Sequence, residues 1–325
     1  MSSPAPRYAV DLGAIRDAAR RIAGLARRTP VLTCGTLDRL AGRSLFFKCE
    51  QFQKVGAFKF RGACNAVRRL DEATAARGVV THSSGNHAQA LALAARQRGI
   101  PAHIVMPENS SPVKRRAVEE YGGQVVLCAA NLAARETTAA DVLRRTGATL
   151  IPPYDHPDVI AGQGTAALEL LEEVPDLDAI VAPVGGGGLL AGTALAARGI
   201  NPVLRIIAAE PRGADDAARS KASGRLIPQT GPQTIADGLR TSLGELTWPV
   251  LRDLVERVVT VREDEIVAAM RLAWERAKLL IEPSAAVAVA AMLADEFRAL
   301  DGARRVGVIL SGGNVNLDEL PWSVR

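Results

Sequence analysis

Lys59 is the residue best suited to covalent chemistry in this sequence. It lies between Phe58 and Phe60, and a lysine that faces inward beside aromatic rings is partly desolvated. Desolvation favours the neutral amine, which is the form that adds to a carbonyl group. The chain contains only six lysines, so the search for such an amine is short. A surface lysine whose stem packs on apolar neighbours is the alternative that the local context leaves open.

Four consecutive glycines form the second chemically informative feature. Residues 185–188 stand between an apolar, strand-like segment and a helix-like segment. Their backbone N–H groups can point at one anion, and the N-terminus of the following helix adds positive potential. The spacing matches neither the Walker A pattern nor a dinucleotide-binding fingerprint. We therefore predict a phosphate-binding loop of another type, with a tightly packed turn as the alternative.

A polar loop at residues 83–87, with the sequence SSGNH, opens another predicted helix. Its two serines and Asn86 place hydroxyl and amide groups at a helix N-terminus, a setting suited to a carboxylate. A plain serine N-cap is the simpler alternative, although two serines and an asparagine exceed what a cap requires. His82 and His87 flank the loop without a triad partner at a recognisable spacing, so we interpret both as structural or supporting histidines.

The elements that must position these loops alternate between strand and helix. We predict strands at 79–82, 102–106, 124–128, 178–183, 203–210, 257–261 and 306–310, most of them apolar on both faces. We predict helices at 86–98, 111–121, 263–280 and 284–298. This alternation indicates an α/β protein with two open, mostly parallel twisted sheets and helices on both faces. Ligands of such sheets bind beyond the carboxyl ends of the strands.

The order of elements predicts two lobes. Residues 79–150 form a β-α-β-α-β-α-β run that can close as a small mobile domain, and residues 1–78 and 151–325 form the larger domain. Because residues 83–87 belong to the smaller lobe and Lys59 to the larger one, the site lies between them. We therefore expect substrate binding to close one lobe onto the other.

Composition excludes several classes of protein. The 325 residues are 48% hydrophobic and 23% charged, with a net charge of +5 and no long polybasic run, so we expect no nucleic-acid partner. The longest uncharged stretch, 179–197, contains Pro183 and four glycines, which argues against a membrane span. The four cysteines show no paired spacing and the N-terminus lacks an apolar export signal, so we expect a cytoplasmic protein.

Four motifs in one order carry a resemblance to a known family. They are GAFKFRGA around Lys59, SSGNH at 83–87, GGGGLLAG at 185–192 and SGGN at 311–314. They resemble the pyridoxal-phosphate enzymes of the tryptophan-synthase-β-like fold, and most of all the serine racemase and serine/threonine dehydratase family. The similarity runs over nearly the whole chain, including VIAGQGT at 159–165 and LLIEP at 279–283.

The resemblance implies a role for each motif. Lys59 would hold the cofactor as an imine and move the α-proton on one face, while Ser84 would act on the opposite face. The implied cofactor-binding residues are Phe58, Lys59, Asn86, Gly185, Gly186, Gly187, Gly188, Gly238 and Ser311. The implied substrate-binding residues are Ser83, Ser84, Asn86, His87, Tyr154 and Thr241.

These roles predict a β-elimination that converts L-serine or L-threonine to a 2-oxo acid and ammonia. A serine at the ring nitrogen leaves that nitrogen largely neutral, which suits rapid loss of the leaving group. Ser84 also permits racemisation, because inversion needs acid–base groups on both faces. Serine racemase is therefore the alternative, followed by 3-hydroxyaspartate dehydratase. A silent scaffold and a nucleotide-dependent oxidoreductase are further alternatives, disfavoured by intact Lys59, Ser84 and Ser311 and by the missing GxGxxG pattern.

The resemblance also implies a divalent cation and a homodimer. Two carboxylates and a carbonyl from one turn can hold a hard cation, and Glu210, the Ala214 carbonyl and Asp216 match the Mg²⁺ or Mn²⁺ site of the family. On spacing alone, a solvated acidic turn is the alternative.

Some positions depart from the family pattern. Ala57, Val55, Tyr154 and Thr241 replace residues that are common there, and they weigh against racemase specificity more than against dehydratase activity. Lys54, Lys114 and Asn314 could bind ATP, although the loop at 33–36 differs from that of ATP-regulated members.

Overall fold

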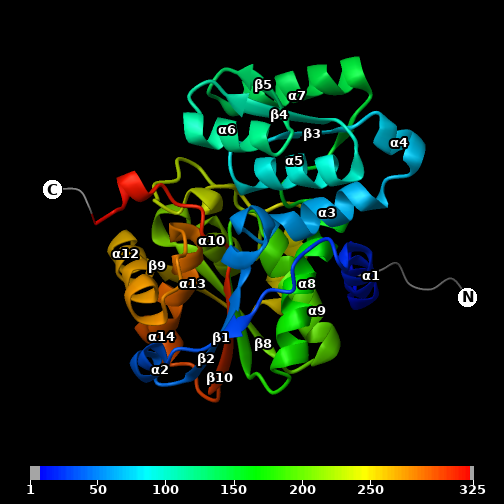
Figure 1. Ribbon diagram of the computed structural model, residues 1–325. Coiled ribbons are helices and arrows are strands. Elements are labelled where there is room, and N and C mark those ends of the chain that lie inside the picture. Colours follow the sequence, from blue (N-terminus) through cyan, green and yellow to red (C-terminus); the bar gives the residue numbers. More distant parts are fainter. Residues whose placement is uncertain (1–7, 323–325) are drawn as a thin grey trace, which may run out of the picture.

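The computed structural model describes residues 8–322 and contains two separate sheets (Figure 1). Residues 1–7 lie outside this range. They form the start of the N-terminal segment in which we predicted no export signal. The larger sheet has the order β1-β2-β10-β7-β8-β9, and only β1 runs antiparallel to its neighbour. Its strands are β1 (Val31–Leu32), β2 (Ser44–Cys49), β7 (Ala179–Pro183), β8 (Arg205–Pro211), β9 (Arg257–Val261) and β10 (Arg305–Leu310).

The smaller sheet has the order β5-β4-β3-β6 and is wholly parallel. Its strands are β3 (Val79–His82), β4 (Ala102–Pro107), β5 (Gln124–Cys128) and β6 (Thr149–Leu150). The predicted α/β class with two open, mostly parallel sheets is thereby confirmed.

Helices cover both faces of each sheet (Figure 1). On the smaller sheet, α5 and α6 pack on one face and α7 on the other. On the larger sheet, α8 and α9 lie opposite α12 and α13. The helices are α1 (Leu12–Ile22), α2 (Gly35–Ala41), α3 (Lys59–Arg69), α4 (Glu72–Ala76), α5 (Asn86–Arg98), α6 (Pro112–Glu120), α7 (Leu132–Thr146), α8 (Pro157–Glu173), α9 (Gly188–Ile200), α10 (Asp216–Ser223), α11 (Thr247–Leu254), α12 (Glu263–Leu272), α13 (Pro283–Leu293) and α14 (Asp295–Arg298). Within residues 8–322, none of these is both long and apolar enough to cross a membrane.

Strand β7 shows why the central strands read as continuous apolar runs. Ala179 and Val181 belong to the core under α13, whereas Ile180 and Ala182 belong to the core under α8 and α9. Successive side chains of a strand point to opposite faces, so a strand with helices on both faces must be apolar throughout. All five residues of β7 are buried, and the glycine loop therefore starts from the rigid centre of the sheet.

Helix α3 joins the two sheets. Its residues Phe60, Cys64 and Val67 share one apolar core with Leu91 of α5 and Ile104 of β4. The predicted domain boundary between residues 78 and 79 is thus crossed by continuous packing. The division into a large domain and a small mobile domain remains a prediction.

Two predicted helices end differently in the structure. The segment at 263–280 is α-helical only to Leu272, because a π-helical turn follows (Ala273–Ala277) and Lys278 takes a positive φ of 59°. The segment at 284–298 is divided at Ala294, whose extended backbone separates α13 from α14. Helical periodicity alone cannot register such local changes of pitch.

Candidate active site

Lys59 begins α3, at the centre of the site. Its Nζ donates a hydrogen bond to the Pro153 carbonyl at 2.7 Å and lies 5.1 Å from the centroid of the Phe58 ring. Burial lowers the pKa of Lys59 to about 8, and the negative charge of Glu282 opposes this shift. A far larger share of this side chain is therefore the neutral amine near neutral pH than in an exposed lysine, as its aromatic neighbours predict, but the protonated form predominates below pH 8.

The turn before Lys59 is strained. Val55 has a φ of 57°, a left-handed conformation that β-branched residues rarely adopt. The Val55 carbonyl accepts a hydrogen bond from Asn314 Nδ2 at 2.7 Å, and the Gly56 carbonyl accepts one from Gly313 N–H at 2.9 Å. These contacts hold the strained turn against the loop that follows β10. Strain of this kind is typical of functional sites.

The glycine loop runs from β7 into the N-terminus of α9 and is tightly enclosed. A Cβ atom on Gly186 would lie 2.3 Å from the ring of Tyr154, and one on Gly185 would lie 2.9 Å from the Leu239 backbone. Gly187 has a φ of 87° and faces Thr247, whose hydroxyl donates to the Gly186 carbonyl at 2.9 Å. Only glycine fits these positions, and α9 starts where the loop ends.

The Tyr154 ring lies against the glycine loop, and Thr241 lies beside the Tyr154 phenol. Burial raises the pKa of the Tyr154 phenol, and a hydrogen bond from Thr241 opposes the shift. Two residues predicted to bind substrate are thus in contact with each other, and Tyr154 also contacts Gly186. The structure brings them together from segments on opposite sides of the glycine loop in the sequence.

The loop at 83–87 follows β3, and Asn86 ties it to the larger sheet's side of the site. Asn86 Nδ2 donates to the Glu282 carboxylate at 3.0 Å, and Asn86 Oδ1 accepts from Asn314 Nδ2 at 2.9 Å. Within residues 8–322, the Ser84 hydroxyl makes no hydrogen bond, and the Ser83 hydroxyl accepts only one long bond, from Gly85 N–H at 3.4 Å. The two serines are therefore free to bind a ligand.

Glu282 is a residue that sequence reasoning missed as part of the site. It is 5% exposed, directly precedes α13 and accepts hydrogen bonds from both Asn86 Nδ2 and Asn314 N–H. Burial raises its pKa to about 7, and the charge of Asp237 adds to this shift. One signal was present in the sequence: an acid between the apolar run at 279–281 and Pro283.

Ser311 and Gly238 complete the floor of the site. Ser311 follows β10, is 3% exposed, and accepts a hydrogen bond at its carbonyl from Phe58 N–H at 3.0 Å. Its hydroxyl makes no hydrogen bond to any residue between 8 and 322. Gly238, in the short 3₁₀ turn Asp237–Leu239, donates its N–H to Ser284 Oγ at 3.1 Å.

His87 is in the first turn of α5 and is 2% exposed. Its Nε2 contacts the Ile151 carbonyl at 2.9 Å, whereas its Nδ1 has no hydrogen-bond partner among the described residues. Burial, reinforced by the positive charge of Lys59, lowers the pKa of His87 to about 3. The imidazole is neutral, and only one of its two nitrogens is satisfied within the protein.

The predicted cation ligands lie together at the end of β8. Glu210 and Asp216 are fully buried, and burial raises their pKa values to about 8 and about 6. Glu210 accepts the N–H groups of Ala217 and Ala218 at 2.8 Å, but Asp216 Oδ1 is buried without a partner. Two buried carboxylates with an unsatisfied oxygen suit a cation.

Ala214 ends the short 3₁₀ turn Arg212–Ala214 beside these acids and is also fully buried. Among residues 8–322, no group of three or more His, Cys, Asp or Glu side chains is arranged to hold a metal. A cation here would rely on the Ala214 carbonyl as well as on the two acids.

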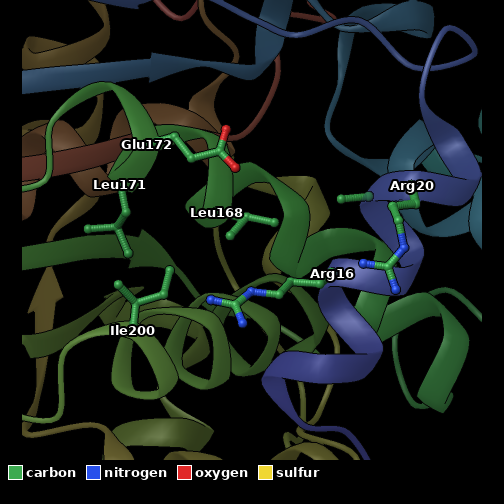
Figure 2. A pocket seen from close by; sticks show the side chains of 7 residues that line it. Arg16, Arg20, Leu168, Leu171, Glu172 and Ile200 are labelled. Carbon is green, nitrogen blue, oxygen red and sulfur yellow. The ribbon is translucent and has the colours of Figure 1, made fainter.

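A surface depression of about 430 Å³ lies elsewhere, between α1, α8 and α9 (Figure 2). None of the predicted site residues lines it. Its lining residues are Arg16, Ala19, Arg20, Leu168, Leu171, Glu172 and Ile200.

The fold and the site together define an α/β enzyme that combines a buried lysine with a glycine-rich anion loop at a helix N-terminus. The chain matches the family described as pyridoxal-phosphate dependent enzyme over residues 22–312. The protein belongs to this family, as its motifs predict. Its residues fit the cofactor, since the glycine loop is a cradle for phosphate, Lys59 offers the amine and Ser311 has a free hydroxyl.

Two curated relatives and one solved structure are similar over nearly the whole chain. Serine racemase from Arabidopsis thaliana is 54% identical over 323 residues, covering 98% of both chains. A β-hydroxyaspartate dehydratase from Paracoccus denitrificans is 50% identical over 303 residues, covering 93% of this chain and 96% of its own. The structure of maize serine racemase superposes with a TM-score of 0.95 at 52% identity, covering 96% of this chain and 95% of that one.

Proposed function

We propose that this protein is a serine racemase that interconverts L- and D-serine. Racemases are among its relatives at about half identity or more, so the comparisons favour the activity that sequence analysis placed second. The observation that carries the proposal is the pairing of the Lys59 amine with an uncommitted Ser84 hydroxyl. Asn86 of the Ser84 loop donates a hydrogen bond to Glu282, and the charge of Glu282 acts on the pKa of Lys59.

The division of labour follows from the groups present. The cofactor, when bound, supplies an electron sink that stabilises negative charge at Cα. Lys59 moves the α-proton on one face of the substrate, and Ser84 moves it on the other. The glycine loop holds the phosphate, and the N-terminus of α5 with its two serines holds the substrate carboxylate.

Elimination is the second activity that we propose for this site. Removal of the α-proton from serine also permits loss of the hydroxyl group as water, and hydrolysis of the released enamine, through its imine form, gives a 2-oxo acid and ammonia. The similarity to the dehydratase from Paracoccus denitrificans supports 3-hydroxyaspartate as an alternative substrate of this elimination. Both reactions need Lys59, but only inversion needs an acid–base group on the second face.

A product panel tests the proposal. The purified holoenzyme is incubated with L-serine, D-serine, L-threonine and the 3-hydroxyaspartates, and chiral chromatography measures inverted amino acid against 2-oxo acid. We expect inversion of serine in both directions. Lys59→Ala is the control, since it should be colourless and inactive. Dehydration of 3-hydroxyaspartate with no inversion of serine would contradict the proposal.

We also propose that Glu210, the Ala214 carbonyl and Asp216 hold Mg²⁺ or Mn²⁺. The partnerless Asp216 Oδ1 supports this assignment. A homodimer and a cytoplasmic location remain predictions.

ATP binding remains a prediction too. Lys114 pairs with Asp237 at 2.8 Å, and Asn314 Nδ2 donates to Val55 and Asn86. ATP would have to replace these contacts to use either side chain.

A further inference from the structure

The hydrogen-bonding state of His87 follows from its one contact. Nε2 lies 2.9 Å from the Ile151 carbonyl, and a carbonyl oxygen only accepts hydrogen bonds, so Nε2 carries the proton. A neutral imidazole has one N–H, so Nδ1 carries a lone pair. This nitrogen is a hydrogen-bond acceptor, it is buried, and it has no donor among residues 8–322.

The imidazole lies near the reacting lysine. His87 binds the carbonyl of Ile151, and Lys59 Nζ binds the carbonyl of Pro153 two residues later. Carbonyl groups at this spacing are no more than about 7 Å apart. The charge of Lys59 acts on the pKa of His87, in keeping with this proximity. His87 is also the last residue of the loop at 83–87, which is predicted to bind the substrate carboxylate.

An acceptor at Nδ1 excludes one of the roles predicted for this side chain. A carboxylate offers only acceptor oxygens, so it cannot pair with an unprotonated nitrogen. His87 can assist the substrate carboxylate only through its backbone N–H. The Ser84 hydroxyl does not donate to Nδ1 either, since this nitrogen has no partner in the described chain. A donor that arrives with the ligand would satisfy this nitrogen.

We propose that His87 determines substrate specificity by accepting a hydrogen bond at Nδ1 from the C3 hydroxyl of a small 3-hydroxy amino acid. The inference rests on the proposed function, since it assumes that such a substrate occupies the site. A buried acceptor that only the correct substrate satisfies disfavours analogues that lack the donor. His87 thus distinguishes serine from amino acids of the same size and shape without a hydroxyl group.

The matched analogue is L-2-aminobutyrate, which carries a methyl group in place of the serine hydroxyl. Exchange of the α-proton in D₂O, followed by NMR, reports the same chemical step for both compounds. The wild-type holoenzyme should favour L-serine in kcat/KM by about 10- to 100-fold, the range expected for leaving a buried acceptor unpaired. A ratio near one in the wild type would overturn the proposal without any variant.

Two variants then locate the effect. His87→Phe removes the acceptor while keeping a ring, and it should lower kcat/KM for L-serine until the ratio approaches one. His87→Asn retains an acceptor and should restore part of the preference. Equal losses for both compounds in His87→Phe would mean that His87 only supports the fold. Absence of exchange with serine in the wild type would instead overturn the proposed racemase.

Discussion

The glycine loop and the loop at 83–87 look alike in sequence but differ in packing. Both follow a parallel strand, both open a helix, and both are predicted to bind an anion. Every glycine of the first loop has neighbours that a Cβ atom would crowd, at 2.3 to 3.0 Å. In the second loop, a Cβ atom on Gly85 would meet nothing within 4 Å, and the Ser84 hydroxyl is free.

This difference separates a preformed half of the site from an adaptable one. The glycine loop is enclosed by Tyr154, Leu239 and Thr247, so its N–H groups are oriented before any ligand binds. The loop at 83–87 is attached mainly through Asn86 to Glu282 and Asn314. We infer that the first half retains the cofactor through every turnover, whereas the second adjusts to each substrate.

The largest expected effect concerns the open loop. Ser84→Ala should lower serine racemisation by about 10²- to 10⁴-fold, the usual contribution of a positioned acid–base group. Elimination from L-serine should change little, because Lys59 alone can remove the α-proton of that isomer. Chiral chromatography and an assay for pyruvate measure the two reactions in one sample. Equal loss of both would contradict the assignment of two faces.

The pH dependence of cofactor loading tests the lysine that lies between the loops. The Lys59 pKa is lowered from 10.5 to about 8, and only the neutral amine reacts. Loading onto the apoenzyme should therefore accelerate about 50-fold between pH 6 and pH 8 and level off near pH 9. Visible absorbance follows the reaction. A rate that still rises steeply beyond pH 9 would indicate an ordinary, exposed lysine.

A matched pair of glycine substitutions tests the packing difference directly. Gly186→Ala forces a methyl group against the Tyr154 ring and should weaken cofactor binding by about 10- to 100-fold, as expected for an overpacked site. Gly85→Ala is the control, because its added methyl group enters open space. Cofactor retained after dialysis measures both. Similar losses in the two variants would show that enclosure is not what distinguishes the loops.

The smallest expected effect concerns the cation. Burial raises the pKa values of Glu210 and Asp216, so a bound cation must offset the cost of ionising them, and a chelator should remove the stabilisation that this ion supplies. We expect the Tm to fall by about 3–8 °C if the ion is bound well above its Kd. Asp216→Asn should no longer respond to the chelator. An unchanged Tm in the wild type would contradict the proposed cation site.

The local sequence predicted those helices and strands whose tertiary packing agrees with their own hydrophobic pattern. The structure has β3, β5, β9 and α5 with the predicted bounds, because apolar runs and helix-stopping glycines act over a few residues. The glycine loop and Lys59 were identifiable for the same reason, because the residues next to them in the sequence indicate their chemistry.

Only the tertiary structure decided which of these residues meet. Asn86 reaches Glu282 across 196 positions of sequence, and Tyr154 reaches Gly186 from a different segment. No periodicity encodes such pairs, because they arise from how two sheets and α3 pack together. The same packing buries His87 and leaves Nδ1 without a donor among the described residues, which changes the proposed role of a residue that the resemblance implied for the substrate carboxylate to that of an acceptor for the substrate hydroxyl. The sequence by itself thus determined the chemistry that is available, and long-range packing decided which groups remain free to use it.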